Sequence, residues 1–336
     1  AYLNPFTTLP TLDILCGFYD VEGNPLASAP QQILRKAQEA LEAETGCRLE
    51  ALGELEYYLF SPADDLFPVE EQRGYHEAAP FSKWSQVRTE ALHHLVSMGC
   101  SVKYAHAEVG NFVTDGRQVI QQEIEFLPTD VTRAADQMVL AKWVVREIAH
   151  AHGIEVSFSP KIAVGQAGSG MHFHTRLMKD GVNQFSQGAG LTGTDRRVIG
   201  GYLSHAASLT AFGNTAPVSF LRLVPHRETP TSICWGRGNR SVLVRVPLDC
   251  GRVAARARGC AAEPARRRGR TGRAGLSRRR PRRCPPTDPL LASITAIPIT
   301  RPRGAARPRA ARPEQPRTRR SDEPRAPPSG MLAPPR

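Results

Sequence analysis

The chain has 336 residues with 44 basic and 32 acidic side chains, a formal net charge of +12. The charge is uneven, because residues 249–336 hold 23 Arg, no Lys and 6 acids, whereas residues 1–248 hold 21 basic and 26 acidic residues. Residues 1–248 therefore have the mildly acidic balance of many soluble enzymes, and no stretch of the chain approaches the ~20 apolar residues of a membrane span.

The cysteines and the first residues bear on the cellular compartment. Seven cysteines are scattered without a CxxC pair, which argues against a disulfide framework or a structural zinc site and predicts a reducing compartment. The start, Ala1-Tyr2-Leu3, has no signal-peptide pattern and no initiator Met. We therefore expect the chain to begin inside a larger protein.

Helices and strands alternate along residues 30–248. Apolar residues at helical spacing predict helices over Pro30 to Gly46, about Ser82 to Met98, about Val131 to His152, and Gly200 to Phe212. Strands are predicted over 53–60, 154–158 and 241–246, and at the run Met171-His172-Phe173-His174. Alternating elements with polar residues on the strands indicate an α/β or α+β catalytic domain.

Residues 249–336 have a different composition. They contain no Phe, Trp or Tyr and are dominated by Arg, Pro, Ala and Gly, so we expect a disordered tail. Arg without Lys in such a mixture is typical of GC-rich DNA translated out of frame, and we interpret the tail in this way. The alternatives are a low-complexity basic tail and an arm that contacts nucleic acid.

Two pairs of side chains on predicted strands carry the first candidate chemistry. Glu54 and Glu56 are two residues apart and share one strand face, and His172 and His174 repeat this geometry. Neighbouring carboxylates repel each other unless a cation intervenes, and acids with a histidine suit Mg²⁺ or Mn²⁺ better than zinc. For each pair alone, a solvent-facing or structural role is the alternative. Further acids near strand-like segments are Glu108 and Glu123.

A glycine-rich loop and three arginines complete the candidates. The loop, residues 165–170, matches neither a Walker nor a dinucleotide-binding pattern, but its glycines let backbone approach a ligand closely. Arg222, Arg240 and Arg245 lie further along the chain, and guanidinium groups suit carboxylate and phosphate oxygens. Acids, histidines and arginines together predict metal-assisted phosphoryl transfer involving an anionic substrate.

In their order and spacing, these motifs resemble the glutamine synthetase family. The matching segments include GELEYYLF, QQEIEF, GSGMHFH and RLVPHRETPTSICWGRGNRSVLVRVP, and the match covers almost all of residues 50–248. An insertion between Glu108 and Glu123 is similar to that of a longer bacterial variant. The resemblance implies an α+β catalytic domain over residues 1–248, with an incomplete antiparallel, barrel-like sheet flanked by helices, followed by the tail.

The resemblance also implies two metal sites. One Mg²⁺ or Mn²⁺ ion would be held by Glu56, Glu108 and Glu123. The second, among the ATP phosphates, would be held by Glu54 and His172. The family completes this second site with an acid from an Arg-x-Glu-x-Arg strand, which residues 249–258 do not contain.

The remaining roles concern the substrates. His174 and Arg245 would bind ATP, Arg222 and Gly168 would bind glutamate, and Arg240 would stabilise the transferring phosphoryl group. The implied activity is that of a glutamate–ammonia ligase: ATP phosphorylates the γ-carboxylate of glutamate, and ammonia attacks the acyl phosphate. Catalytic Glu228, on a flap that excludes water, would help accept the proton from ammonium.

The implied partners are glutamate, ammonia, ATP and further copies of the chain in a cytoplasmic ring, with no membrane or nucleic-acid partner. The family's small N-terminal β-domain is missing, and Ala167 and Arg176 replace an Asn and a small polar residue of many members. We therefore expect this chain to be inactive and not to form the ring. The alternatives are a glutamate–amine ligase and a non-catalytic, decayed product whose basic tail contacts nucleic acid.

Overall fold

The computed structural model describes residues 1–185, 190–224 and 229–247, and the backbone of 292–294. All of these lie in one compact unit, Ala1–Ile299. Of the tail, only Ala292–Ile294 is described, and it forms a strand. The prediction of a disordered tail otherwise falls outside the described residues.

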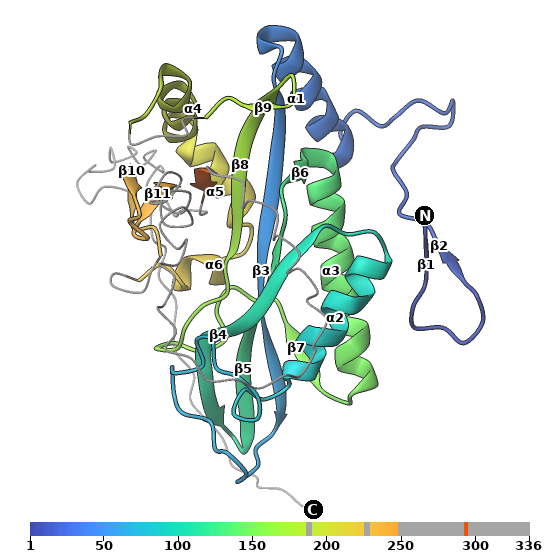
Figure 1. The fold of residues 1–336 in the computed structure, drawn as a ribbon, viewed down its shortest axis with the longest axis vertical. Coiled ribbons are helices and arrows are strands. Elements are labelled where there is room, and N and C mark those ends of the chain that lie inside the picture. Colours follow the sequence, from blue (N-terminus) through green and yellow to red (C-terminus); the bar gives the residue numbers. More distant parts are fainter. Residues whose placement is uncertain (186–189, 225–228, 248–291, 295–336) are drawn as a thin grey trace, which may run out of the picture. The chain divides into compact units, whose positions relative to one another are not determined.

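The described residues form a ten-stranded, largely antiparallel sheet around the long strand β3 (Figure 1). The order across the sheet is β10 (Ser232–Arg237), β11 (Val242–Val246), β12 (Ala292–Ile294), β8 (Met171–Lys179), β3 (Arg48–Pro62), β5 (Arg117–Phe126) and β4 (Val102–Thr114). Only β10 and β11 are parallel along this path. Shorter strands pair at the sides: β6 (Thr129–Asp130), β7 (Glu155–Ser157) and β9 (Val182–Asn183). A separate pair is formed by β1 (Tyr2–Leu3) and β2 (Leu12–Asp13).

Three predicted helices are confirmed with small changes at their ends. They are α1 (Pro30–Thr45), α2 (Ser85–Ser97) and α3 (Val131–Ala151). Gly46, in the left-handed conformation, ends α1, and Asp130 caps α3 by accepting a hydrogen bond from the Thr132 amide. Among the helices in the described ranges, none is both long and apolar enough to cross a bilayer.

The single helix predicted over 200–212 is wrong in its extent. The structure has α4 (Gly193–Ser204) and α5 (Ala206–Gly213), separated at His205, and a short α6 (Val218–Leu221) follows. The start of α4 lies earlier because Thr192 and Asp195 form a capping box, in which each side chain accepts a hydrogen bond from the other residue's amide.

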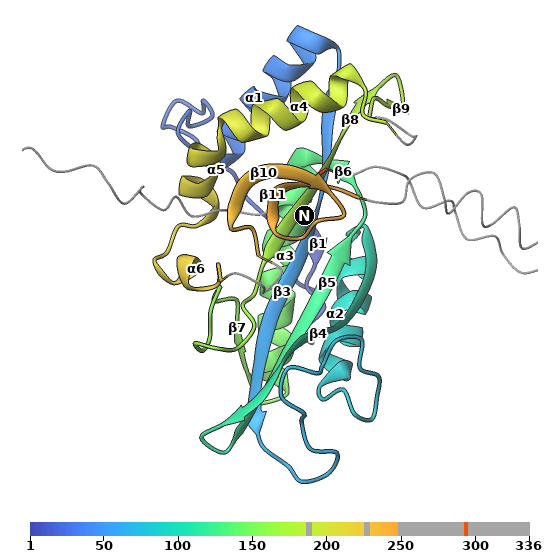
Figure 2. The same ribbon diagram turned by 90° about the vertical axis from the view of Figure 1, so that its left-hand side faces the viewer.

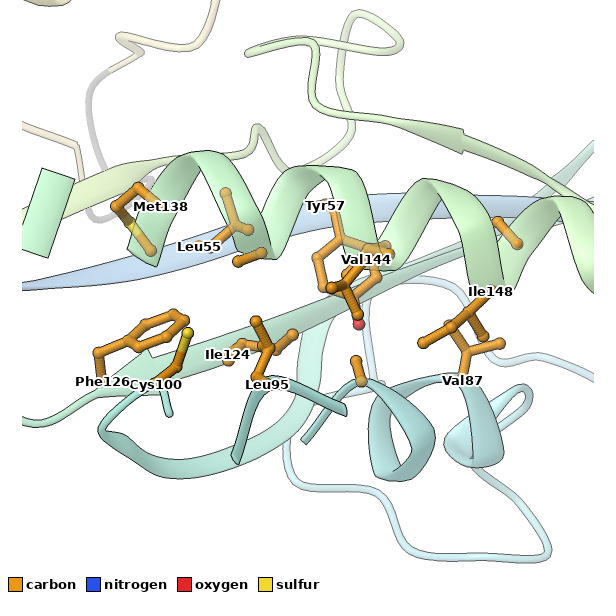
Figure 3. Packing of buried hydrophobic residues seen from close by; sticks show 14 of the residues in the cluster. Leu55, Tyr57, Val87, Leu95, Cys100, Ile124, Phe126, Met138, Val144 and Ile148 are labelled. Carbon is orange, nitrogen blue, oxygen red and sulfur yellow. The ribbon is translucent and has the colours of Figure 1, made fainter. Parts of the chain in front are cut away.

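The main core lies between the sheet and helices α2 and α3. Alternate residues of β3 (Leu55, Tyr57 and Leu59) pack against a cluster that includes Leu95 of α2 and Val144 of α3 (Figure 3). The intervening residues Glu54, Glu56 and Tyr58 leave β3 on the opposite face. The two ribbon views agree in placing α2 and α3 on one side of β3 and the pair β10–β11 on the other (Figures 1 and 2). The predicted α+β fold with a barrel-like sheet is confirmed.

Candidate metal and substrate site

The register between β3 and β8 places the first two acids beside the histidines. Glu54 lies opposite His172, with its Oε2 2.8 Å from His172 Nδ1 and its Oε1 2.7 Å from His174 Nε2. Glu56 Oε1 lies 3.9 Å from the same His172 nitrogen. Burial opposes ionisation of Glu54, but the two histidines hold its pKa well below the usual range. Glu54 and Glu56 thus share one face of β3, and His172 and His174 share one face of β8, as the sequence predicts.

The strands on the other side of β3 add a second acidic group. Glu123 on β5 lies opposite both Glu56 on β3 and His106 on β4, and its Oε2 is 3.2 Å from His106 Nε2. Burial, with the charges of Glu56, Glu54 and Glu108, raises the pKa of Glu123 to about 8, although the hydrogen bond with His106 opposes the shift. Burial and Glu56 also raise the pKa of Glu108. These carboxylates therefore need a cation to be ionised together.

Two sets of side chains bring their ligand atoms within 4.8 Å of one another: Glu54, Glu123 and His172 in one, and His106, Glu108 and Glu123 in the other. The donors are carboxylate oxygens and imidazole nitrogens, and none is a thiolate. This donor set fits Mg²⁺ or Mn²⁺. Both sets include Glu123.

The glycine-rich loop approaches these acids through its backbone. The Gly170 amide donates to Glu56 Oε2 over 2.8 Å, and Gln121 Nε2 donates to the same oxygen over 2.9 Å and to Gly168 O over 3.1 Å. A Cβ added at Gly170 would lie 2.9 Å from His172 Nε2 and 3.1 Å from Glu56 Oε1. A larger residue here would displace the side chains of His172 and Arg222.

Arg222 brings a buried positive charge to the same place. It directly follows α6, and its Nη2 would lie 2.9 Å from a Cβ added at Gly170. Its own Cβ would lie 2.7 Å from a Cβ added at Gly168. Burial lowers the pKa of the guanidinium, and Glu56 opposes this shift. Its Nε is buried without a hydrogen-bond partner among the described residues, so a donor remains for an anionic ligand.

The remaining predicted site residues are Arg245, Arg240 and Glu228. Arg245 on β11 and His174 on β8 both lie opposite Ser293 of β12, so their side chains leave the sheet on the same face. Arg240 is exposed in the turn between β10 and β11. Glu228 falls outside the described residues.

Comparison with known proteins identifies the family. The sequence profile of the family "Glutamine synthetase, catalytic domain" matches residues 27–264, a range that contains every residue of the two metal-ligand sets. The chain belongs to the glutamine synthetase family. The profile extends past the boundary at residue 248 suggested by the change in composition, and that boundary remains a prediction.

Curated relatives of this glutamine synthetase family member include the glutamine synthetases of Thermus thermophilus and Pyrococcus furiosus. The first is 34% identical over 264 residues, covering 74% of this chain and 57% of the relative, and the second 36% identical over 239 residues, covering 71% and 52%. The chain thus spans about half the length of these relatives. The cryo-EM structure of Plasmodium falciparum glutamine synthetase matches with a TM-score of 0.61 and 24% identity, over 68% of this chain and 50% of that one, which shows a shared fold.

Sequence reasoning did not assign three residues of this glutamine synthetase site. Gln121 joins Glu56 to the glycine-rich loop, His106 contacts Glu123, and Glu125 Oε1 lies 3.6 Å from His106 Nε2. The signal was available for two of them, because Gln121, Glu123 and Glu125 alternate along β5 and share one face. Arg176, noted only as a departure from the family, pairs with Glu50 through its Nη2 at 2.5 Å.

Proposed function

We propose that the chain carries the metal- and glutamate-binding part of a ligase that forms glutamine from glutamate and ammonia at the expense of ATP. The observation that supports this most directly is the position of Arg222. Its buried guanidinium lies beside a set of acids that can hold divalent cations. An amino acid with two carboxylates and a polyphosphate both suit such a combination of fixed cation and metal.

The proposed reaction has two steps. The γ-carboxylate of glutamate attacks the terminal phosphorus of ATP, which gives an acyl phosphate and ADP. Ammonia then attacks the acyl carbon, phosphate leaves, and glutamine is formed. Bound Mg²⁺ or Mn²⁺ would supply positive charge that offsets the negative charge developing on the phosphoryl oxygens.

The protein residues position the reactants. We assign Glu54 and His172 to one ion, and Glu56, Glu108 and Glu123 to the other. Arg222 and the Gly168 backbone bind glutamate, and His174 and Arg245 face ATP from the same side of the sheet. Arg240 acts on the phosphoryl group, and Glu228 takes a proton from ammonium. A dry site matters, because water would hydrolyse the acyl phosphate.

Calorimetric titration with Mn²⁺, followed by L-glutamate, tests the proposal without requiring turnover. We expect Mn²⁺ to bind and L-glutamate to bind the Mn²⁺-loaded chain more tightly than L-aspartate, because Arg222 and the glycine-rich loop fix the carboxylates. Arg222→Lys should weaken glutamate binding, since it loses the planar fork of donors. Mn²⁺ binding with no preference between the two amino acids would contradict the assignment.

Phosphate release from ATP tests the chemistry itself. The proposal requires release to depend on both glutamate and ammonia, and replacement of ammonia by methylamine distinguishes this activity from that of a glutamate–amine ligase. Release that is independent of glutamate would argue against either ligase. The expectation of low turnover, based on the incomplete second metal site, is measured in the same assay.

A further inference from the structure

A segment between β3 and α2 pairs with β4 at the point where β4 leaves β5. The β4–β5 register shifts between Ala107 and Asn111, so Glu108 lies in an irregular stretch. Here the Gln72 amide donates to Asn111 O over 2.8 Å and the His76 amide to Ala107 O over 2.9 Å. The segment 72–76 therefore supplies partners for backbone groups of β4 beside a proposed metal ligand.

The segment fits closely against this irregular stretch. A Cβ added at Gly74 would lie 2.5 Å from Glu108 O. Gln72 and His76 have positive φ values of 57° and 56°, which non-glycine residues adopt only when their surroundings hold them there. The ring of His76 stacks on that of His106 at a centroid distance of 4.5 Å. The backbone from Gln72 to His76 is thus fixed at both of its ends by contacts with β4.

The Gln72 side chain reaches from this segment to the glycine-rich loop. Its Oε1 accepts a hydrogen bond of 3.0 Å from the Ala167 amide, and its Nε2 donates to Gln166 Oε1 over 2.5 Å. The methyl side chain of Ala167 offers no polar group, so the loop is attached here through its backbone. Tyr58 donates to Ala167 O over 2.8 Å from the opposite side of the same residue.

We propose that Gln72 is a positioning residue for glutamate binding, because it fixes the Ala167 peptide and with it the adjoining Gly168 backbone. The inference rests on the proposed function, in which Gly168 contacts glutamate. Tyr58 on β3 donates to Ala167 O, and Gln121 on β5 donates to Gly168 O. Gln72 instead links the loop to the segment beside Glu108. Loss of Gln72 should therefore affect the amino-acid site and leave the metal ligands in place.

The test compares Gln72→Ala with a matched control, Gln38→Ala, in the full chain. Gln38 Oε1 also accepts a backbone hydrogen bond, 3.0 Å from the Leu49 amide, but it lies on α1 and has no described contact with the loop. Calorimetry with L-glutamate on the Mn²⁺-loaded chain should show affinity about tenfold weaker for Gln72→Ala, which loses its hydrogen bonds to the Ala167 amide and to Gln166. Mn²⁺ affinity should stay the same in both variants, and Gln38→Ala should bind glutamate like the parent.

Hydrogen exchange at the Ala167 amide provides a readout that needs no substrate. This amide should exchange faster in Gln72→Ala, and protection should return in Gln72→Glu, which keeps an acceptor oxygen. Unchanged exchange in Gln72→Ala, or equal loss of glutamate affinity in the two alanine variants, would overturn the proposal. If the parent chain binds no glutamate, the proposed function fails, whereas the exchange result still decides whether Gln72 positions the loop.

Discussion

Buried carboxylates on neighbouring strands are the residue-level feature that most constrains this protein. Glu56 and Glu123 are 5–9% exposed and lie opposite each other on β3 and β5. Two ionised carboxylates in this position repel each other, and burial strengthens the effect. The metal-free site must therefore keep a proton or lose stability.

Repulsion between these carboxylates makes the stability of the folded chain depend on pH. The pKa of Glu123 is raised from 4.5 to about 8, so the folded chain holds a proton that the unfolded chain has released. The stability contributed by this group is fully present below about pH 4.5 and is lost as the pH rises through about 8. We expect the melting temperature of the metal-free chain to fall between about pH 4.5 and about pH 8.

Glu123→Gln is the variant that isolates this effect. It keeps the shape and cannot ionise, so its melting temperature should fall less over the same range. Saturating Mn²⁺ should reduce the fall in the parent chain, because the ion stabilises the ionised carboxylates. Equal pH dependence in the parent and in Glu123→Gln would show that another group is responsible.

A second residue-level prediction concerns Gly170. Gly170→Ala would place a methyl group 2.9 Å from both Arg222 Nη2 and His172 Nε2, so Mn²⁺ affinity should fall about tenfold or more, as when support of a metal ligand is removed. Gly200→Ala is the control, since a Cβ on this residue of α4 meets nothing within 4 Å. Equal Mn²⁺ affinities for the two variants, measured by calorimetry, would contradict the prediction.

The sequence was sufficient to predict which residues share a face of one strand, but not which residues lie opposite each other on neighbouring strands. Period-two spacing places Glu54 with Glu56 and His172 with His174. That Glu54 lies opposite His172, and Glu56 opposite Glu123, depends on register between strands distant in the sequence. His106 was missed for this reason, because its role depends on the β4–β5 register.

At the scale of elements, the predicted helices agree best with the structure where the sequence contains clear residues for starting or ending a helix. Helices α1 and α3 have a strong apolar face and a following glycine, and their predicted ends are close to those observed. The start of α4 was misplaced because its capping box, at Thr192, precedes a first turn that contains no apolar side chain (Gly193-Thr194-Asp195-Arg196). The irregular pairing of β4 could not be foreseen, since a bulge leaves no fixed pattern in a single sequence.

The capping box gives a testable prediction for α4. Thr192→Ala removes the acceptor for the Asp195 amide, 3.2 Å away, and should lower the free energy of unfolding by about 1 kcal/mol. Thr192→Ser keeps the hydroxyl and should lose much less. Denaturant unfolding measures both variants, and equal stability of Thr192→Ala and the parent would show that the box contributes nothing.

At the scale of the whole molecule, β12 connects two parts of the sheet. Its backbone pairs with β11 on one side and β8 on the other, so these strands meet only through residues 292–294 in the described part of the chain. Arg245 and His174, both assigned to ATP, lie on either side of it. The arrangement of the proposed nucleotide side thus depends on a segment of the Arg-rich tail.

Two shortened chains test this dependence. A chain that ends at residue 299 keeps β12, whereas one that ends at residue 248 leaves β8 and β11 unpaired along facing edges. We expect the longer chain to match the parent in melting temperature, and the shorter one to melt lower and to show faster amide exchange along β8. Parent-like exchange in the shorter chain would show that β12 does not hold the two strands together.

A carboxylate common to both metal-ligand sets would make two bound ions interdependent. Glu123 belongs to the set with Glu54 and His172 and also to the set with His106 and Glu108. An ion bound in one set therefore changes the charge and the free ligand atoms available to the other, and the coupling must be equal in both directions. Titration with a divalent cation should accordingly deviate from the curve of two independent sites. A protein of this design would respond to cation concentration as a unit.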